Sequence, residues 1–327
     1  MRVLVVGGAG YIGSHMVRAL LRPGHEAVVL DNLSKGHREA VPADSLVLGD
    51  FGDGELLDRV MQQHGIEAVM HFGALSLVGE SMTRPDKYFQ NNVAKGLALL
   101  DGMVRNKVRY LVFSSTAAVY GEPEQAPITE DARLRPTNPY GESKLAFEKI
   151  LKWYDAAFGL KSISLRYFNA AGADPAGDIG EDHSPETHLI PLVIQAALGR
   201  RGNIRVFGTD YPTPDGTCIR DYIHINDLAE AHLLALKALA GGAESTAYNL
   251  GNGSGYSVLE VIRTVEQVSG RKVEAVLGGR RAGDPAVLVA GSERIKQELG
   301  WQPKFPELEE IVGTAWKWHF GHPDGFK

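Results

Sequence analysis

The stretch "VVGGAGYIGSH", residues 5–15, joins a short apolar run to a helical pattern. Its glycines Gly7, Gly10 and Gly13 have the spacing GxxGxxG. Glycine allows a tight turn, and its missing side chain lets the backbone approach a pyrophosphate at the N-terminus of the following helix. Such a triplet is weak evidence by itself, and the strand, turn and helix around it give it meaning. The stretch therefore predicts a dinucleotide-binding βα unit at the start of the chain.

An acidic residue, Asp31, ends the next predicted strand. A carboxylate at this place can accept hydrogen bonds from the ribose diol of adenosine and would repel a 2′-phosphate. The sequence therefore predicts NAD rather than NADP as the cofactor. Asp50, at the end of the third predicted strand, is expected either to reach the adenine or to cap the next helix.

The first half of the chain alternates short β-rich runs with helical patterns. Most of these runs lack two-residue alternation, which is typical of strands buried on both faces of a parallel sheet. The alternation predicts an α/β fold with a Rossmann-type doubly wound parallel sheet. The predicted strands are 2–7, 26–31, 45–50, 67–72, 109–115 and 161–167, and the predicted helices are 11–21, 53–64, 86–105 and 140–158.

The character of the sequence changes after residue 168. Residues 169–188 are rich in Gly, Pro, Asp and Ala, which indicates an ordered loop or a functional flap. We therefore assign residues 1–168 to an NAD-binding domain and 169–327 mainly to a smaller mixed α/β substrate lobe, with a return of the chain around 219–250. Ser257 and Glu260 predict a capping box. The other expected elements are helices at 189–199, 226–239, 257–268 and 306–318 and strands at 204–207 and 219–224.

Composition limits the classes of function. The chain has 327 residues, of which 44% are hydrophobic and 23% charged, as in an ordinary globular protein. A net charge of -6 argues against a nucleic-acid partner. No apolar run is long enough to span a membrane, and no His, Cys or Glu spacing suggests a metal site. The single cysteine, Cys218, excludes an internal disulfide and suits a reducing compartment, so we expect a cytoplasmic protein without a membrane partner.

A second constellation combines a hydroxyl, a tyrosine and a lysine. Thr116 lies just past the fifth predicted strand, within "FSSTAAVYG" (113–121), and "YGESK" (140–144) opens a later helix. A helix places Tyr140 and Lys144 on one face, and ligands of open α/β sheets bind outside the carboxyl ends of the strands. A Tyr-x-x-x-Lys pair alone is usually a surface feature. Combined with the NAD motif and Thr116, it indicates a catalytic site.

Simple electrostatics allow this tyrosine to act as a base. Lowering its pKa from about 10 to about 7 requires about 4 kcal/mol. One positive charge about 4 Å away, at an effective dielectric constant of about 20, supplies about that much. Lys144 could be that charge, with help from the nicotinium ring of NAD⁺, and Thr116 could donate or relay a hydrogen bond to the same oxygen.

The chain resembles the extended short-chain dehydrogenase/reductases and, within them, the UDP-galactose (UDP-glucose) 4-epimerases, nearly end to end. In the first half the resemblance is carried by "GGAGYIGSH" (7–15), "LDNLSKG" (30–36) and "PYGESK" (139–144). In the second half it is carried by "RYFNAAGADPAGDIGEDH" (166–183) and "VFGTDYPTPDGTCIRDYIHINDLA" (206–229). The match therefore includes the expected substrate lobe.

The resemblance implies roles position by position. Lys144 would hold the nicotinamide ribose, and Thr116 and Tyr140 would meet the sugar 4-hydroxyl. The implied NAD contacts are Gly7, Gly10, Tyr11, Ile12, Gly13, Asp31, Asn32, Leu33, Ser34, Lys35, Gly36, Asp50, Phe51, Phe72, Gly73, Ala74, Leu75, Asn91, Tyr140, Lys144 and Phe168. The implied UDP-sugar contacts are Thr116, Tyr140, Asn169, His188, Leu189, Arg205, Val206, Phe207, Arg220, Arg281, Asp284 and Leu288.

The resemblance also implies a reaction and an assembly. Tyr140 would take the 4-hydroxyl proton while hydride passes from C4 to bound NAD⁺, and hydride would return to the other face of the 4-keto sugar. UDP would stay anchored throughout, far from the reacting carbon. The family usually dimerises through the helices expected at 86–105 and 140–158, so we expect a homodimer.

Rival functions are a 4,6-dehydratase, an epimerase of another UDP-sugar such as UDP-glucuronate or a UDP-pentose, and a non-catalytic NAD-sensing regulator. Dehydratases of this type carry Asp-Glu after the strand-5 threonine, where this chain has Ala117 and Ala118, and alanine cannot move a proton. A regulator need not keep Tyr140 and Lys144, and this chain has both.

Two departures from the pattern of close relatives suggest further hypotheses. Ser76 replaces a lysine near the nicotinamide, which predicts weaker retention of NAD. Leu288 aligns with a bulky tyrosine of some relatives, which predicts some activity on N-acetylated sugars such as UDP-N-acetylglucosamine.

Overall fold

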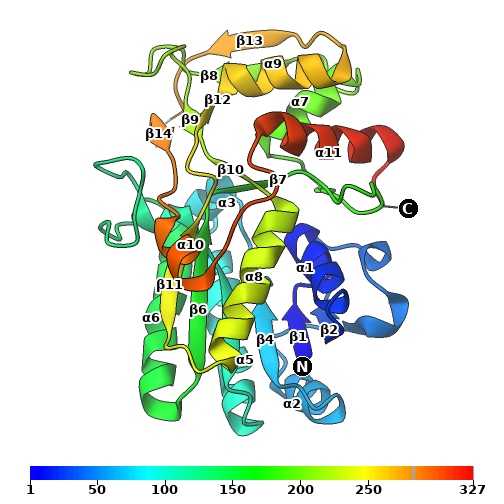
Figure 1. Cartoon of the computed structure of the whole chain (residues 1–327), viewed down its shortest axis with the longest axis vertical. Coiled ribbons are helices and arrows are strands. Elements are labelled where there is room, and N and C mark those ends of the chain that lie inside the picture. Colours follow the sequence, from blue (N-terminus) through cyan, green and yellow to red (C-terminus); the bar gives the residue numbers. More distant parts are fainter. Residues whose placement is uncertain (282–283, 327) are drawn as a thin grey trace.

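A seven-stranded parallel sheet forms the larger part of the molecule (Figure 1). The structure is a computed structural model that describes residues 1–281 and 284–326. The strand order is β11-β6-β5-β4-β1-β2-β3, so the order reverses between β1 and β4, as in a doubly wound sheet. The predicted Rossmann-type fold is confirmed. The strands are β1 (Arg2–Val6), β2 (Glu26–Asp31), β3 (Leu46–Leu48), β4 (Ala68–His71), β5 (Tyr110–Thr116), β6 (Lys161–Tyr167) and β11 (Thr246–Leu250).

Helices cover both faces of this sheet because its strands are apolar on both sides. Val3 and Val5 belong to the core beneath α1 and α8, whereas Leu4 and Val6 belong to the core beneath α2, α5 and α6. Alternate residues of one strand therefore fill two cores, which explains the unbroken apolar run in the sequence. The helices are α1 (Tyr11–Leu21) and α8 (Ile225–Ala240) on one face and α2 (Gly54–Gln63), α5 (Lys95–Arg105) and α6 (Pro139–Phe158) on the other.

The helix expected over 86–105 is interrupted. It consists of α4 (Pro85–Phe89), a π-helical turn over 90–94, and α5. The wide turn contains the buried side chain of Asn92, whose amide binds both the N–H and the C=O of Leu75 and also the Ser143 hydroxyl. Such π-helical turns are frequent at functional sites. The preceding short helix α3 (Val78–Thr83) was not predicted.

The strand expected over 219–224 is divided in two. Arg220 ends β9 (Ile219–Arg220), whereas β10 (Tyr222–His224) belongs to a different sheet. Between them, the buried Asp221 carboxylate accepts hydrogen bonds from the backbone N–H groups of Asn252, Gly253 and Ala290. This carboxylate therefore connects the break between the two strands to two other segments of the chain. Burial raises the pKa of Asp221 to about 6.

A smaller unit lies above the sheet in Figure 1, with α7, α9 and α11 around a separate apolar core. The chain also returns to the large sheet, because α8 covers one face and β11 pairs with β6. The predicted capping box is confirmed, since Ser257 Oγ and the Glu260 carboxylate each accept the other residue's N–H. The remaining elements are α7 (Leu189–Ala197), α9 (Val258–Ser269), α10 (Glu293–Leu299), α11 (Leu308–Gly321), β7 (Asn169–Ala171), β8 (Ile204–Phe207), β12 (Tyr256–Ser257), β13 (Ala275–Gly278) and β14 (Val287–Leu288).

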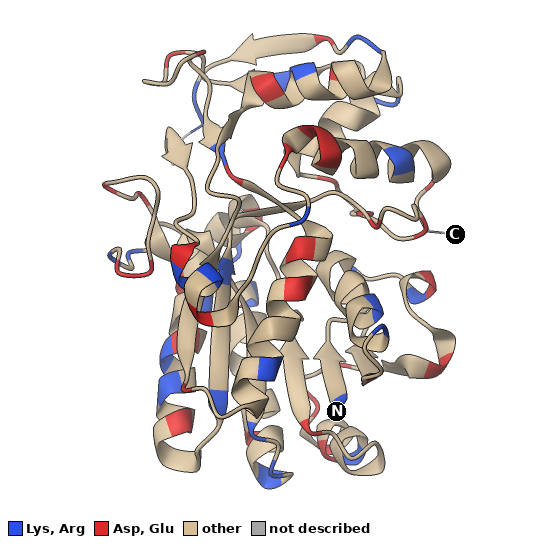
Figure 2. Ribbon diagram, in the orientation of Figure 1, with Lys and Arg blue, Asp and Glu red and all other residues tan. Residues whose placement is uncertain are grey.

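Charged side chains of both signs are interspersed over both parts of the molecule (Figure 2). This distribution agrees with the small net charge of -6. Among residues 1–281 and 284–326, no helix is both long and apolar enough to cross a membrane.

Candidate active site

The glycine-rich turn lies between β1 and α1, at the carboxyl edge of the sheet. Gly7 has a φ of +75°, and a Cβ atom added there would lie 2.6 Å from the backbone nitrogen of Gly73. A Cβ at Gly13 would lie 2.2 Å from the Gly7 carbonyl oxygen. At Gly10 the nearest atom would be 3.5 Å away, an ordinary contact. The protein itself therefore requires glycine at positions 7 and 13, whereas at position 10 the missing side chain leaves room for a ligand.

The N-terminus of α1 is open to an anion. Its cap residue is Gly10, and no side chain of the described residues caps this end. The N–H groups of a helix's first turn carry partial positive charge and bind phosphate well. Together with the space at Gly10, this fits a pyrophosphate.

Asp31 ties the end of β2 to this turn. One carboxylate oxygen accepts the Ala9 N–H at 2.9 Å, and the other accepts the Leu33 N–H at 2.8 Å. The carboxylate thus lies beside the glycine-rich turn, where the sequence placed the adenosine ribose. Leu33 has a positive φ of 56°, so the chain turns sharply directly after this acid.

Asp50 is not a helix cap. Asp53 caps α2 instead, by accepting the N–H groups of Glu55 and Leu56, so that alternative for Asp50 was wrong. Asp50 accepts hydrogen bonds from Lys95 Nζ at 2.6 Å and Asn32 Nδ2 at 3.2 Å. Burial alone would raise the pKa of Asp50. The hydrogen bonds lower the pKa by more than burial raises it, so the pKa of Asp50 stays below its ordinary value.

The remaining predicted NAD contacts mostly follow the carboxyl ends of β2, β3 and β4. The loop after β4 passes close to the glycine-rich turn, since Gly73 lies against Gly7 and packs on the Phe51 ring. Phe72 packs on His232, with ring centroids 5.0 Å apart. Asn91 donates to the Asn92 side chain that holds Leu75. Lys35 Nζ, in contrast, reaches across to the Ser184 carbonyl.

The structure brings Tyr140 and Thr116 together. Thr116 ends β5, and α6 begins nearby because Asn138 caps it and Pro139 occupies its first turn. Burial raises the pKa of the Tyr140 hydroxyl above its ordinary value, and the neighbouring Thr116 side chain partly offsets this. The tyrosine therefore needs a nearby positive charge before it can serve as a base.

Lys144 lies in the core behind this pair. Its Nζ donates to the Ser114 carbonyl at 2.7 Å and lies 4.9 Å from the centre of the Phe113 ring. Burial lowers the pKa of Lys144 to about 7, although Glu148 opposes this change. Burial therefore disfavours the charged form of this lysine, which weakens the positive charge that the sequence argument assigned to it.

A buried polar network connects α6 to the strands of the sheet and was not predicted from the sequence. Arg166 forms a two-pronged ion pair with Glu148 at 2.6 and 3.0 Å, and Ser115 donates to the same carboxylate at 2.5 Å. Arg166 also donates to the Tyr120 hydroxyl. Glu148 follows Lys144 by one helical turn, so the network fixes the depth of the lysine. The sequence signal that could have predicted this network is the pair of charged residues at otherwise apolar positions of the predicted strand 161–167 and the predicted helix 140–158.

Five predicted UDP contacts gather around β8, β9 and the chain before β14. Arg281 and Asp284 form a bidentate ion pair with both distances 3.0 Å, and Arg220 lies 3.9 Å from the same carboxylate. The guanidinium groups of Arg205 and Arg281 lie 5.4 and 5.6 Å from the centre of the Phe207 ring. Two arginines thus share one acid, beside an aromatic ring that is 38% exposed. We call these five residues the arginine cluster.

Other predicted substrate residues are placed differently. Val206 is fully buried in the core of the smaller unit, so the structure exposes no part of it to a ligand. Asn169 donates to the Asp221 carbonyl next to Arg220. His188 and Leu189 stand at the start of α7, where the His188 ring contacts Glu181.

The two positions that depart from the relatives' pattern lie in different surroundings. Leu288 is half-buried and packs on the small apolar cluster against which Phe168 also packs. It pairs with Arg220 across β14 and β9, which places it next to the arginine cluster. Ser76 is exposed, in the loop between β4 and α3.

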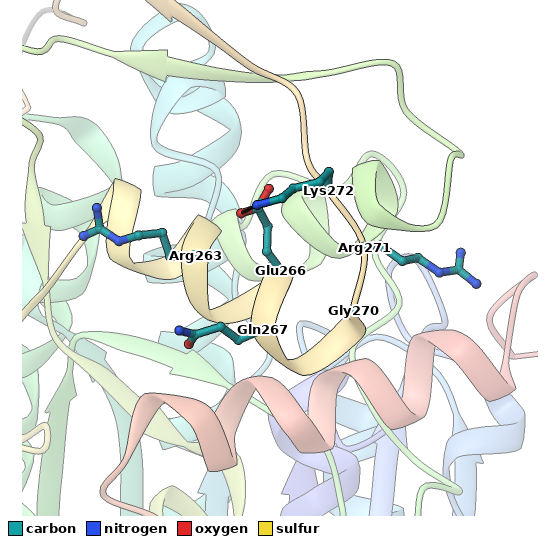
Figure 3. Close-up of a pocket in the computed structure, with 6 residues that line it drawn as sticks. All are labelled: Arg263, Glu266, Gln267, Gly270, Arg271 and Lys272. Atoms are coloured by element: carbon teal, nitrogen blue, oxygen red, sulfur yellow. Dashed lines mark hydrogen bonds and ion pairs between the residues drawn. The ribbon is translucent and has the colours of Figure 1, made fainter.

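A surface hollow lies at the C-terminal end of α9 (Figure 3). None of its lining residues is a predicted site residue, and Lys272 there pairs with Glu266 at 3.1 Å. We therefore assign the candidate active site to the carboxyl edge of the large sheet and not to this hollow. The hollow is lined by Arg263, Glu266, Gln267, Gly270, Arg271 and Lys272.

The doubly wound sheet, the glycine-rich turn with Asp31, and Tyr140 with Lys144 define an NAD-dependent enzyme of the short-chain dehydrogenase/reductase type. The model of the "NAD dependent epimerase/dehydratase family" matches residues 3–251. The chain belongs to this family.

Individual relatives extend the match over the whole chain. The chain is 54% identical to a UDP-glucose 4-epimerase of Halalkalibacterium halodurans, with 100% of this chain and 98% of the relative covered. The crystal structure of UDP-glucose 4-epimerase from Brucella ovis in complex with NAD matches with a TM-score of 0.95 and 46% identity, covering 98% of each chain. That of the Bifidobacterium longum enzyme, in complex with NAD+ and UDP, matches with a TM-score of 0.93 and 37% identity over 100% of both chains. The resemblance stated from the sequence is confirmed.

Proposed function

We propose that this protein interconverts UDP-glucose and UDP-galactose by reversible 4-epimerisation with a bound NAD. The observation that carries the proposal is the position of α6 at the turn after β5, where Gly141 lies against the Ala118 carbonyl. This puts Tyr140 and Thr116 at the same carboxyl edge of the sheet as the glycine-rich turn. The full-length similarity to UDP-glucose 4-epimerases supports it.

The bound NAD would supply a hydride acceptor that returns the hydride within the same cycle. The α1 N-terminus at Gly10 would hold its pyrophosphate, and the Asp31 carboxylate would hold the adenosine ribose. Asp50 and Asn32 lie together at the end proposed for the adenine. Lys144 would bind the nicotinamide ribose, which gives its ammonium group new acceptors and favours the charged form.

The main task of the side chains is to move one proton. Tyr140 would take the proton of the sugar 4-hydroxyl and later return it, while Thr116 hydrogen-bonds at the same place. Because burial opposes ionisation of Tyr140, the ammonium group of Lys144 must supply the compensating charge. Ala117 and Ala118 next to Thr116 supply no further acid or base, so epimerisation is favoured over dehydration.

The arginine cluster would anchor UDP. Arg220 and Arg281 already face a carboxylate, that of Asp284, and a diphosphate offers acceptors of the same kind. Because the diphosphate is remote from the reacting C4 atom, anchoring it lets the 4-keto sugar turn without leaving the protein. Residues 169–327 would thus bind mainly the substrate and residues 1–168 mainly NAD, with α8 and β11 returning to the large sheet.

The assembly and location follow from the same proposal. We infer a homodimer, because Trp153 and Phe158 on α6 are 75% and 56% exposed and Phe89 on α4 is 43% exposed. Exposed large apolar side chains of this kind are typical of a subunit interface. A cytoplasmic location suits the unpaired Cys218.

The acceptance of N-acetylated sugars is a second, narrower proposal. It rests on Leu288, which is smaller than tyrosine and lies beside the arginine cluster. The Ser76 hypothesis of weaker NAD retention remains a prediction.

The deciding experiment is a turnover panel with the full-length protein. UDP-galactose, UDP-N-acetylgalactosamine and UDP-glucuronate are each incubated with it, and the products are separated and quantified. We expect UDP-glucose from UDP-galactose. If NAD is bound and UDP-galactose is not converted, the proposal is wrong, and conversion of UDP-glucuronate alone would favour the rival epimerase.

A further inference from the structure

The loop between β7 and α7 gathers two histidines and two glutamates, although the sequence spacing predicted no metal site. Glu181, His183, Glu186 and His188 each place one donor atom within 4.8 Å of the other three. His183 Nδ1 lies 3.0 Å from Glu181 Oε1 and 3.8 Å from Glu186 Oε1. His188 Nδ1 contacts the same Glu181 oxygen. The four donor atoms therefore lie close enough together to share one ion, and we call these residues the loop cluster.

Burial distinguishes the loop cluster from an acidic surface patch. The side chains of Glu181 and Glu186 are only 4% and 5% exposed. Two carboxylates removed from water in this way need a compensating positive charge. Protonated His183 and His188 would supply that charge without a metal, whereas one divalent cation bound by two neutral imidazoles supplies it and also makes the site neutral overall.

The donor set indicates which cation fits. Two imidazole nitrogens and two carboxylate oxygens suit Zn²⁺, which prefers four ligands in a tetrahedron. Ligand atoms about 2.0–2.2 Å from a tetrahedral ion lie about 3.3–3.6 Å apart. The separations of 3.0 and 3.8 Å from His183 Nδ1 lie on either side of this value, whereas the contact between His188 Nδ1 and Glu181 is shorter and would have to lengthen around an ion. Mg²⁺ and Ca²⁺ prefer more ligands, mainly oxygen.

We propose that the loop cluster binds one Zn²⁺ as a structural site. All four coordination positions come from the protein, which is typical of structural rather than catalytic zinc. The loop already contacts distant parts of the chain, because Trp318 Nε1 donates to the Glu181 carbonyl and the His37 ring contacts the Asp182 carbonyl. The His183 ring also packs edge-on against Tyr11, next to the glycine-rich turn. The ion would thus fix this loop between α1, α11 and the start of α7.

The test uses the full-length protein stripped with a chelator and then titrated with Zn²⁺ or Co²⁺. We expect one ion per chain, intense visible absorption of tetrahedral Co²⁺, and a rise in Tm on the order of 5 °C at saturating Zn²⁺. His183→Asn and Glu181→Gln should each weaken Zn²⁺ binding at least about tenfold and remove the Tm rise. His64→Asn, at the end of α2, is the matched control and should behave like the wild type.

Several outcomes would overturn the proposal. These are a wild type that binds no stoichiometric Zn²⁺, a weak octahedral Co²⁺ spectrum, tighter binding of Mg²⁺ or Ca²⁺, or equal loss of binding in His64→Asn. If His183→Asn does not fold, Glu181→Gln, which keeps the side-chain volume, decides the question. If neither variant folds, the wild-type Co²⁺ spectrum and stoichiometry decide it. Each readout is independent of catalytic activity, so failure of the proposed epimerase function would leave this test intact.

Discussion

The cofactor side and the substrate side of the candidate site are built in different ways. On the cofactor side, backbone geometry dominates, with Gly7 and Gly13 in close contact with other backbone atoms and an open helix N-terminus at Gly10. On the substrate side, long charged side chains dominate, with Arg220 and Arg281 sharing Asp284. The first side is therefore fixed before any ligand binds, whereas the second can exchange partners. Mutations should separate the two.

The largest effect is expected where the two sides meet. Tyr140→Phe removes the hydroxyl that would carry the proton, so we expect kcat to fall about 10²- to 10⁴-fold. NAD content, measured from the absorbance of the denatured protein, should stay at the wild-type level, because no other NAD contact is changed. Wild-type turnover in this variant would contradict the proposed mechanism.

On the substrate side, Arg281→Met should weaken UDP binding. Loss of a charge-assisted contact to a diphosphate costs about 1.5–3 kcal/mol, or about 10- to 160-fold in KM for the UDP-sugar. Calorimetric titration with UDP measures the loss directly. NAD affinity should not change, and an equal loss of NAD affinity would show that the two sides are not separate. Arg280→Met, which removes the exposed partner of Asp210, is the matched control.

On the cofactor side, Gly13→Ala and Gly10→Ala form a matched pair. The alanine Cβ at position 13 would overlap the Gly7 carbonyl, so we expect a loss of about 1–3 kcal/mol in unfolding free energy without any ligand. At position 10 the protein leaves room, so stability without NAD should be nearly unchanged while NAD affinity falls. Denaturant unfolding with and without NAD distinguishes the two. Equal destabilisation by both substitutions would contradict the idea that position 10 is kept free for a ligand.

The pKa of Lys144 predicts a pH dependence of NAD binding. Its value of about 7 in the free protein means that the lysine loses its proton above pH 7, and the proposed bound state needs the charged form. NAD affinity should therefore be constant well below pH 7 and fall up to about tenfold per pH unit above it, with uptake of a proton on binding. Calorimetry in two buffers of different ionisation enthalpy counts that proton. Lys144→Met should bind NAD more weakly and without this pH slope, so a slope retained in Lys144→Met would assign it to another group.

The smallest effect concerns sugar selection at Leu288. Leu288→Tyr adds bulk beside the arginine cluster, so turnover of UDP-N-acetylgalactosamine should fall about tenfold relative to that of UDP-galactose. Competing both substrates in one reaction measures this ratio. Equal N-acetyl activity in the wild type and the variant would show that Leu288 does not select the sugar. Leu288→Met, of similar volume, is the control.

Sequence reasoning succeeded where local rules decide the structure. The alternation of apolar runs and helical patterns predicted the doubly wound sheet, and Ser257 with Glu260 predicted a helix start. It failed where a buried polar side chain overrides local preference. Asn92 widens the helix expected over 86–105, and Asp221 divides the strand expected over 219–224. In both places a polar side chain bonds to a segment far away in the sequence, and the backbone departs from the regular helix or strand.

By itself, the sequence determined the fold class, the family and the chemical types of the side chains proposed to be catalytic. These depend on short spacings in the sequence, such as GxxGxxG and Tyr-x-x-x-Lys. The geometry of a single turn or helix converts each spacing into the relative positions of its residues. Only the tertiary structure decided that Lys144 meets the Ser114 carbonyl, that Arg166 and Glu148 support it, and that Glu181 and His183 lie together with Glu186 and His188. Such contacts depend on burial and on segments that meet only in the folded chain. Neither the burial of a group nor its distance from a remote group can be read from the order of residues.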